Sequence, residues 1–231
     1  MSEYWYSNMM VETPKQSLSF TCVFFDVDGT LVDSGGAVID TFVEVLTEYR
    51  LPVPSREHLR RHVGPPLWSS LLELGTPKDM LETVIANYRS RYHERFLDPP
   101  LFEGIDQVVK DLSAAGVAMA TATSKQEPLA LAQLEHLGLL DHFTVVAGAT
   151  PDPACTKATV LRDALARLGA AGADTSRPVL VGDRHFDIEG GRAVGVPVIG
   201  VGWGYASEGE LDGADAFAAD PAALSRLLLP H

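Results

Sequence analysis

The fold is decided by the stretch Phe24-Phe25-Asp26-Val27-Asp28-Gly29-Thr30, which places two carboxylates two residues apart where an apolar run ends. Residues 20–25 predict a buried β-strand. Since alternate residues of a strand share a face, Asp26 and Asp28 are expected to point into one pocket at its C-terminal end. Gly29 permits a sharp exit of the chain and a close approach of its backbone to a ligand. Two carboxylates this close repel each other unless a cation or a proton intervenes, so the stretch predicts a metal site, a catalytic pair, or both.

Two other interpretations of an Asp-x-Asp-Gly segment are a calcium loop and a plain turn. The calcium-loop pattern requires Asp or Asn at its fifth position, Gly at its sixth and Glu at its twelfth. Counted from Asp26, those positions hold Thr30, Leu31 and Ala37, which excludes the calcium loop. A plain turn stays open for this segment taken alone.

Length and composition indicate a chain that can bury a large core. It has 231 residues, of which 46 % are hydrophobic, enough for an α/β domain with a smaller inserted domain. The net charge of −13 argues against nucleic acid and anionic membrane as partners, so an anionic substrate requires a local cationic site. No apolar stretch reaches the length of a membrane span, and the two cysteines imply no disulfide framework. A cytoplasmic location is the default expectation.

The order of the predicted elements indicates an α/β fold with an insertion. Residues 1–19 are polar and interrupted, and they predict a loose tail rather than a secretory signal. Only helical patterns follow the first strand, at 36–49, 55–62, 66–74 and 77–96. Later strands are predicted at 117–123, 143–147, 178–182, 197–201 and 215–218, with helices between them. We therefore predict a Rossmann-like parallel sheet core from residues 20–34 and 104–231, with residues 35–103 inserted as a helical cap.

Polar side chains gather where the predicted strands end, which is where ligands sit in such folds. They are Asp26, Asp28, Thr123, Ser124, Lys125, Asp183 and Asp187, together with Lys157 at the start of a helix. The acids favour a divalent cation with oxygen ligands, for which Mg²⁺ is the expected ion, and the hydroxyl and ammonium groups favour phosphate. Ordinary alternatives stay open: Lys157 as an exposed helix residue, Asp187 as a helix cap, and Thr123 as a plain strand residue with Thr121 as its rival.

Four motifs, in this order, resemble those of the haloacid dehalogenase superfamily: Asp26-x-Asp28-Gly29-Thr30, Thr123-Ser124, Lys157 and Gly182-Asp183-x-x-x-Asp187. The resemblance covers residues 20–229 and is to phosphatases with a helical cap, of the phosphoglycolate phosphatase-like kind. It implies that Asp26 attacks phosphorus and forms an aspartyl-phosphate, which water then hydrolyses. It also implies that Asp28 protonates the leaving oxygen and later activates the water.

The same resemblance implies the binding residues. Thr123, with Ser124 in the same motif, and Lys157 would hold the phosphoryl oxygens. Mg²⁺ would sit on Asp26, on the backbone carbonyl of Asp28 and on Asp183, with Asp187 bound directly or through water. In the insertion, Arg61, His62 and Gly64 lie in a segment that resembles the substrate-facing cap loop of this family; an exposed basic helix face is the equal alternative. The cap would close over the substrate and exclude bulk water.

The function expected from these residues is Mg²⁺-dependent hydrolysis of a phosphate monoester on a small phosphorylated metabolite. Two alternatives stay open: a sugar-phosphate mutase of the same superfamily, which would share Asp26 and Asp28, and a catalytically silent protein that binds a metabolite or a partner. A dehalogenase is disfavoured, because that branch does not keep the acid/base carboxyl at the position of Asp28.

Overall fold

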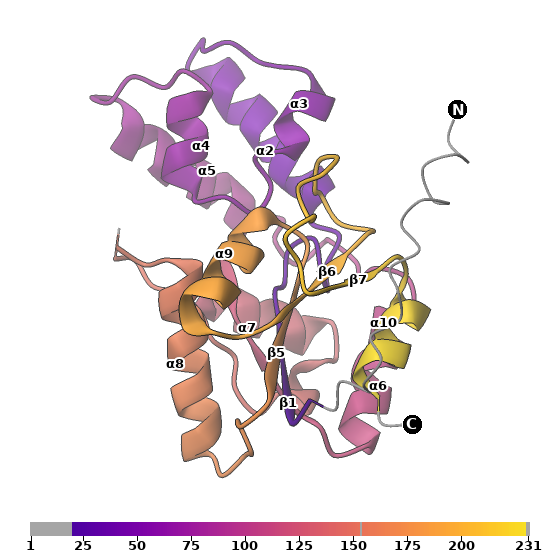
Figure 1. The fold of residues 1–231 in the computed structure, drawn as a ribbon. Helices are drawn as coiled ribbons and strands as arrows, with labels where there is room; N and C mark the ends of the chain where they lie inside the picture. The colour runs from indigo at the N-terminus through magenta and orange to yellow at the C-terminus, as the bar shows by residue number, and fades with distance from the viewer. Residues whose placement is uncertain (1–19, 153, 230–231) are drawn as a thin grey trace, which may run out of the picture.

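The computed structural model describes residues 20–152 and 154–229, so the predicted tail of residues 1–19 lies outside the described residues. The core is a five-stranded sheet with the strand order β2-β1-β5-β6-β7, and every neighbouring pair in it is parallel. Figure 1 shows these strands between helices on either side. The strands are β1 (Cys22–Phe25), β2 (Ala118–Thr121), β5 (Pro178–Gly182), β6 (Val198–Val201) and β7 (Ala216–Ala218). The predicted parallel α/β core is therefore confirmed.

Helices cover both faces of the sheet, which explains why β1 is apolar at every position. They are α6 (Ile105–Ala114), α7 (Glu127–His136), α8 (Lys157–Ala170), α9 (His185–Val194) and α10 (Pro221–Leu228). Val23 and Phe25 pack into a core with α6, α7 and α10, whereas Cys22 and Phe24 pack into a second core with α8 and α9. Since successive strand residues point to opposite faces, a strand between two helical layers must be apolar throughout.

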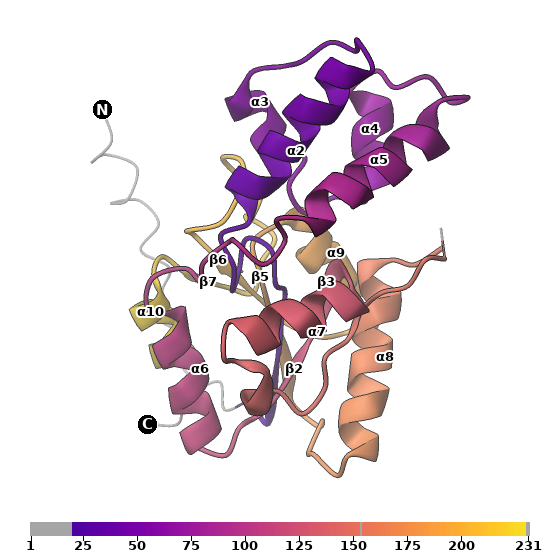
Figure 2. The same cartoon turned by 180° about the vertical axis from the view of Figure 1, so that it is seen from behind.

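Four helices between β1 and α6 form a separate group beyond one end of the sheet (Figure 2), called the cap helices below. They are α2 (Gly35–Glu48), α3 (Arg56–Arg60), α4 (Leu67–Glu73) and α5 (Leu81–His93). The cap helices bury their own apolar cluster, to which α2 contributes Phe42 and Val45. The predicted helix 77–96 is shorter in the structure, because the residues after Pro77 form a turn in which the Met80 amide donates to the Pro77 carbonyl. None of the described helices combines the length and the apolar composition needed to cross a membrane.

Two predicted strands differ from the structure. The strand predicted at 117–123 ends too late, because β2 stops at Thr121. A separate strand, β3 (Thr123–Gln126), follows and pairs with β4 (Gly148–Ala149). The prediction of 143–147 is wrong as well, because that segment forms no continuous strand. It meets β2 in an isolated bridge between Val145 and Ala120, beside single backbone hydrogen bonds such as that from the Thr144 amide to the Met119 carbonyl. Thr121 supplies the physical reason. Its hydroxyl donates to the Ala147 carbonyl and accepts from the Ala147 amide, both at 2.9 Å, so a side chain replaces part of the backbone ladder.

The chain leaves the core for the cap helices and returns through two segments that pair with each other. The Asp33 amide donates to the Pro100 carbonyl at 2.9 Å, and the Phe102 amide donates to the Leu31 carbonyl at 3.1 Å. These hydrogen bonds hold both crossings together at the edge of the sheet where β1 ends. The cap helices are therefore attached next to the C-terminal ends of the strands.

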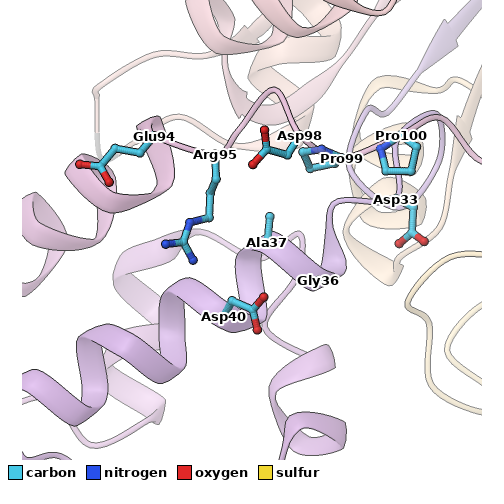
Figure 3. A pocket seen from close by; sticks show the side chains of 9 residues that line it. All are labelled: Asp33, Gly36, Ala37, Asp40, Glu94, Arg95, Asp98, Pro99 and Pro100. Carbon is cyan, nitrogen blue, oxygen red and sulfur yellow. The ribbon is translucent and has the colours of Figure 1, made fainter.

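A cavity of about 610 Å³ lies beside these crossings (Figure 3). Four carboxylates line it, Asp33, Asp40, Glu94 and Asp98, against the single cation Arg95. Its acidic lining is unsuited to an anionic substrate.

Candidate active site

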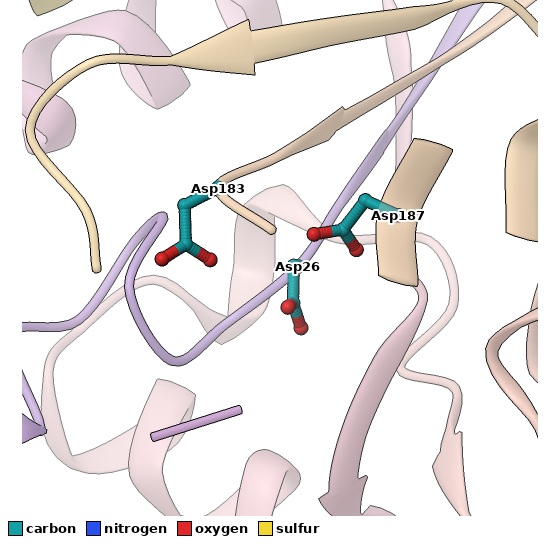
Figure 4. A group of neighbouring side chains, drawn as sticks. All are labelled: Asp26, Asp183 and Asp187. Atoms are coloured by element: carbon teal, nitrogen blue, oxygen red, sulfur yellow. The ribbon is translucent and has the colours of Figure 1, made fainter. Parts of the chain in front are cut away.

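Three carboxylates meet at the C-terminal edge of the sheet (Figure 4). Asp26 follows β1, Asp183 follows β5, and Asp187 stands in the first turn of α9. One oxygen from each lies within 4.8 Å of the others, and none of the three residues is more than 4 % exposed. They converge because β1 and β5 are parallel neighbours, whose ends lie side by side.

The electrostatics of this cluster favour a cation. Burial raises the pKa of Asp26 to about 6, although the Lys157 ammonium opposes the change. Burial also raises the pKa of Asp183 well above its usual range, and the nearby charges of Asp187 and Asp26 add to the effect. Three buried acids that repel one another are stabilised when a bound cation neutralises them.

The donor set also fits a divalent metal ion. The Asp183 Oδ2 accepts the Tyr205 amide at 2.7 Å, whereas its Oδ1 is buried and has no hydrogen-bond partner among the described residues. Carboxylate oxygens are the ligands that hard divalent cations prefer. Gly29 makes room for this carboxylate: its φ is +86°, and a Cβ there would lie 2.2 Å from the Asp183 Oδ2. Both the positive φ and the lack of space for a Cβ therefore require a glycine at position 29.

Lys157 bridges two of the acids. Its ammonium lies 2.9 Å from the Asp26 Oδ2 and 2.8 Å from the Asp187 Oδ1, and it donates to the Ala122 carbonyl at 3.0 Å. Burial alone would lower the pKa of this lysine, but the charges of Asp187 and Asp26 outweigh burial and raise it. Lys157 is therefore a fixed cation and not an exposed helix residue.

Asp187 combines the two roles that the sequence left open. Its Oδ2 accepts the Arg184 amide at 3.0 Å, which caps the start of α9, while its Oδ1 faces Lys157. A single carboxylate thus fixes the helix end and belongs to the buried cluster.

The predicted phosphate-binding residues lie at the same edge. Thr123 opens β3 and is 1 % exposed, and its hydroxyl lowers the pKa of Asp26 by hydrogen bonding. Its rival Thr121 is engaged with Ala147, as described above. Ser124 follows Thr123 and is half-buried, on the opposite side of the strand from its neighbours.

The Asp28 carboxylate is not part of the three-acid cluster. It lies 2.6 Å from the ammonium of Lys125, which is buried. The sequence pattern places Lys125 at a strand end and indicates no role for it. The missed signal was its spacing from Thr123, because two strand residues in alternate positions face the same side.

The predicted cap residues are placed next to the strand ends mainly by their backbone. The carbonyl oxygens of Arg61 and Val63 accept from the guanidinium of Arg184, the residue after Asp183. The Arg61 side chain is exposed, and Gly64 is half-buried.

His62 is buried, and its ring lies 6.2 Å from the Phe42 ring and 5.8 Å from the His58 ring. Burial lowers its pKa, which disfavours the charged form of this imidazole inside the cap helices.

Two further residues of the site have partners remote in the chain, so no local sequence pattern indicates their roles. Arg184 is buried and its Nε lies 2.7 Å from the Glu210 Oε1, an ion pair formed only by folding. Tyr205 donates its amide to Asp183 and its hydroxyl to Asp33, at 2.7 Å each, and so connects the acid cluster to the crossing into the cap helices.

Glu210→Gln is expected to lower the free energy of unfolding by about 2 kcal/mol at pH 7, because it leaves Arg184 buried without its counter-charge. Burial would raise the pKa of Glu210, but the Ser207 amide, His185 and Arg184 outweigh burial and lower it to about 2. A lowered pKa means that the contribution is complete above the usual value of about 4.5 and is lost as the pH falls toward about 2.

Urea unfolding at several pH values measures this effect. The difference between wild type and Glu210→Gln should shrink steadily from pH 5 to pH 2. The control is Glu189→Gln, an exposed carboxyl on the neighbouring helix, with an expected change of less than about 0.5 kcal/mol. A difference that is constant with pH would contradict the assignment.

Comparison with known proteins places the chain in one family. A family model described as haloacid dehalogenase-like hydrolase matches residues 23–201. The chain is 32 % identical over 199 residues to the phosphoglycolate phosphatase of Caulobacter vibrioides, covering 83 % of each chain. It is also 40 % identical over 185 residues to the tyrosine-protein kinase PtkA of Mycobacterium tuberculosis, covering 79 % of this chain and 62 % of PtkA. The chain thus spans less than two thirds of the length of that relative.

Solved structures with the same fold agree. The haloacid dehalogenase-like hydrolase SP0104 from Streptococcus pneumoniae superposes with a TM-score of 0.81 at 28 % identity, covering 89 % of this chain and 96 % of that one. The structure of Mycobacterium tuberculosis PtkA superposes with a TM-score of 0.78 at 38 % identity, with the same coverage. Both similarities extend over the sheet and the cap helices, since they cover most of each chain.

Proposed function

Since the chain belongs to the haloacid dehalogenase-like hydrolase family, we propose that it is a Mg²⁺-dependent phosphatase that hydrolyses a small-molecule phosphate monoester through an aspartyl-phosphate. The observation that carries the proposal is the buried Lys157 ammonium between Asp26 and Asp187 at the strand ends. A fixed cation beside a carboxylate nucleophile attracts a phosphate dianion to the one place where it can be attacked. Relatives named phosphoglycolate phosphatase and 5'-nucleotidase support this substrate class, and a relative named pyrophosphatase supports phosphoryl-group hydrolysis more broadly.

Asp26 is the proposed nucleophile, and its carboxylate is oriented before substrate arrives. Its Oδ1 accepts the Val27 amide at 2.8 Å, and its Oδ2 faces the Lys157 ammonium at 2.9 Å. In the first step an Asp26 oxygen bonds to phosphorus as the bond to the leaving oxygen breaks, and Asp28 gives that oxygen its proton. In the second step Asp28 takes a proton from water, which attacks phosphorus and releases phosphate and the free Asp26 carboxylate.

The remaining residues of the site are proposed to bind the phosphoryl group and the metal ion. Thr123, Ser124 and Lys157 are proposed to bind the phosphoryl oxygens. Mg²⁺ would be held by Asp26, Asp183 and Asp187 with the backbone carbonyl of Asp28. When bound, the ion supplies positive charge that offsets the repulsion between the carboxylates and the phosphate.

A second candidate is phosphoryl transfer to a tyrosine hydroxyl, which is favoured by the 40 % identity to PtkA. The same aspartyl-phosphate would then be attacked by a phenol oxygen in place of water. The two reactions share the aspartyl-phosphate and differ in the acceptor, so free phosphate and phosphotyrosine measured in parallel reactions separate them.

The test measures phosphate release by the wild-type chain from a panel of phosphate esters, with Mg²⁺ and with excess chelator. We expect Mg²⁺-dependent release from at least one small ester. A parallel reaction holds ATP and a tyrosine-containing peptide, and phosphotyrosine without release of free phosphate would favour the second candidate. Absence of both reactions would overturn the proposed chemistry.

Core and cap variants are expected to act differently on such a panel. Lys157→Met should lower kcat/KM for every ester by about 100-fold or more, because all share the transferred group. Arg61→Ala should mainly change the ranking of substrates or their KM, because the exposed Arg61 side chain lies on the cap and not in the acid cluster.

The comparison uses a large, a small and an aryl phosphate for each variant. Lys110→Met is the control, since Lys110 is an exposed lysine paired with Asp106 on α6. The proposed division of roles is wrong if Lys157→Met affects one substrate only, or if Arg61→Ala lowers all three equally.

A further inference from the structure

Lys125 is buried beside Asp28 and all of its donors are used. Its ammonium lies 2.6 Å from the Asp28 Oδ1, 2.7 Å from the Gln133 Oε1 and 3.2 Å from the Tyr92 hydroxyl. An ammonium carries three N–H donors, so these three acceptors determine its position completely. The Lys125 side chain is 2 % exposed and the Asp28 side chain 16 %, so water screens the pair only weakly.

The three acceptors come from three parts of the fold. Asp28 follows β1, Gln133 belongs to α7, and Tyr92 belongs to the cap helix α5. The Gln133 amide group also donates to the Phe96 carbonyl at 2.7 Å, just beyond α5, so its oxygen must face Lys125. Lys125 is therefore held by the core from one side and by the end of the cap helix from the other.

The backbone of Lys125 is fixed as well. Its amide donates to the Thr123 hydroxyl at 3.1 Å, and both residues lie on the buried side of β3. The lysine is thus placed by the same short strand that brings Thr123 to the acid cluster. The Lys125 side chain is therefore held in one position, as is required of a residue that orients a neighbouring catalytic group.

We propose that Lys125 is the positioning residue of Asp28, and that Tyr92 makes the orientation of the Asp28 carboxyl depend on the placement of the cap helix α5. The inference rests on the proposed function, in which Asp28 gives a proton to the leaving oxygen. With its Oδ1 held by Lys125, the carboxyl group keeps one orientation, and proton transfer requires a donor held within hydrogen-bond reach. Lys125 itself need not contact the substrate.

This role has a consequence that a purely structural ion pair lacks. Protonation of the leaving oxygen matters most when the leaving group is strongly basic, and it matters little when the leaving group departs readily as an anion. Loss of the positioning residue must then harm phosphate esters in proportion to the basicity of their leaving groups. The step to measure is the first one, which kcat/KM reports without the later hydrolysis of the aspartyl-phosphate.

The experiment compares Lys125→Met with wild type on p-nitrophenyl phosphate, phenyl phosphate and an alkyl phosphate. The two aryl esters share the phenyl ring and differ by the para-nitro group, whose main effect is to lower the basicity of the leaving group. We expect kcat/KM to fall by about 3-fold, about 20-fold and about 100-fold along this series. Lys110→Met, which removes an exposed lysine on α6, should leave all three unchanged.

A second variant tests the same contact in case Lys125→Met does not fold. Tyr92→Phe keeps the aromatic ring but removes the hydroxyl that Lys125 contacts, and we expect the same trend along the series with a loss of about 5-fold on the alkyl ester. In an Asp28→Asn background, Lys125→Met should cause less than about 3-fold further loss, because the group that it orients is no longer an acid.

Three outcomes would overturn the inference. An equal loss of kcat/KM on all three esters would assign Lys125 to the transferred phosphate or to the fold. Full additivity of Lys125→Met and Asp28→Asn would show that the two residues act independently. If the wild-type chain hydrolyses no ester of the whole panel, the proposed function fails and this inference fails with it, whereas turnover with a flat trend removes only the inference.

Discussion

Asp26→Asn is expected to lower phosphatase turnover by about 10⁴-fold or more while the protein stays folded. The amide cannot form the phosphoryl bond that the carboxylate forms, so the step has no substitute nucleophile. The fold should tolerate the change, because Asn keeps the shape of Asp and removes one of three mutually repelling acids. Initial rates on the best ester of the panel, with circular dichroism and a thermal melt, measure both parts.

The matched control for this variant is Asp106→Asn, the same chemical change at a surface ion pair on α6. Its turnover should equal that of wild type within experimental error. Retention of more than about a tenth of the wild-type rate by Asp26→Asn would remove Asp26 from the role of nucleophile, since loss of the attacking group costs many factors of ten.

Asp183→Asn is expected to abolish the response of the protein to Mg²⁺. In wild type, Mg²⁺ at about 100 times its dissociation constant should stabilise the folded state by about 2.7 kcal/mol, because it binds the folded acid cluster and not the unfolded chain. The variant removes the charge of the carboxylate whose Oδ1 is buried without a partner among the described residues. We expect both the Mg²⁺-dependent rise in melting temperature and the Mg²⁺-dependent activity to disappear.

Asp215→Asn provides the control, because the Asp215 carboxylate also accepts a backbone amide, that of Val198 at 2.8 Å, but lies outside the cluster. This variant should keep the full Mg²⁺ response. A wild-type protein that is fully active in excess chelator, or an Asp183→Asn variant that still melts higher with Mg²⁺, would show that the cluster is not the metal site.

Much of the site could be predicted because it depends on local order in the chain. An apolar run that ends in Asp26 and Asp28 specifies a buried strand with acids at its end, wherever the strand lies in the sheet. The same holds for Asp183 after β5 and for Lys157 at the start of α8. The rule that parallel strands end at one edge then brings these residues together without knowledge of the sheet order.

Local sequence patterns predict strands less well where a side chain takes the place of a backbone hydrogen-bond partner. The apolar pattern of segment 143–147 predicts a strand, yet the Thr121 hydroxyl hydrogen-bonds to both backbone groups of Ala147. Such a substitution depends on how two distant segments approach each other, and neither segment alone indicates it.

The sequence by itself determined the α/β class, the helical insertion after the first strand and the residues that carry the proposed chemistry, because periodicity and spacing act over a few residues. Only the tertiary structure decided which remote groups those residues meet: Lys125 with Asp28 and Tyr92, Arg184 with Glu210, and Tyr205 with Asp183. Each of these pairs joins segments separated by many residues, and a buried polar group is satisfied by whatever partner the packing brings to it. That packing is a property of the whole chain and has no short sequence signature.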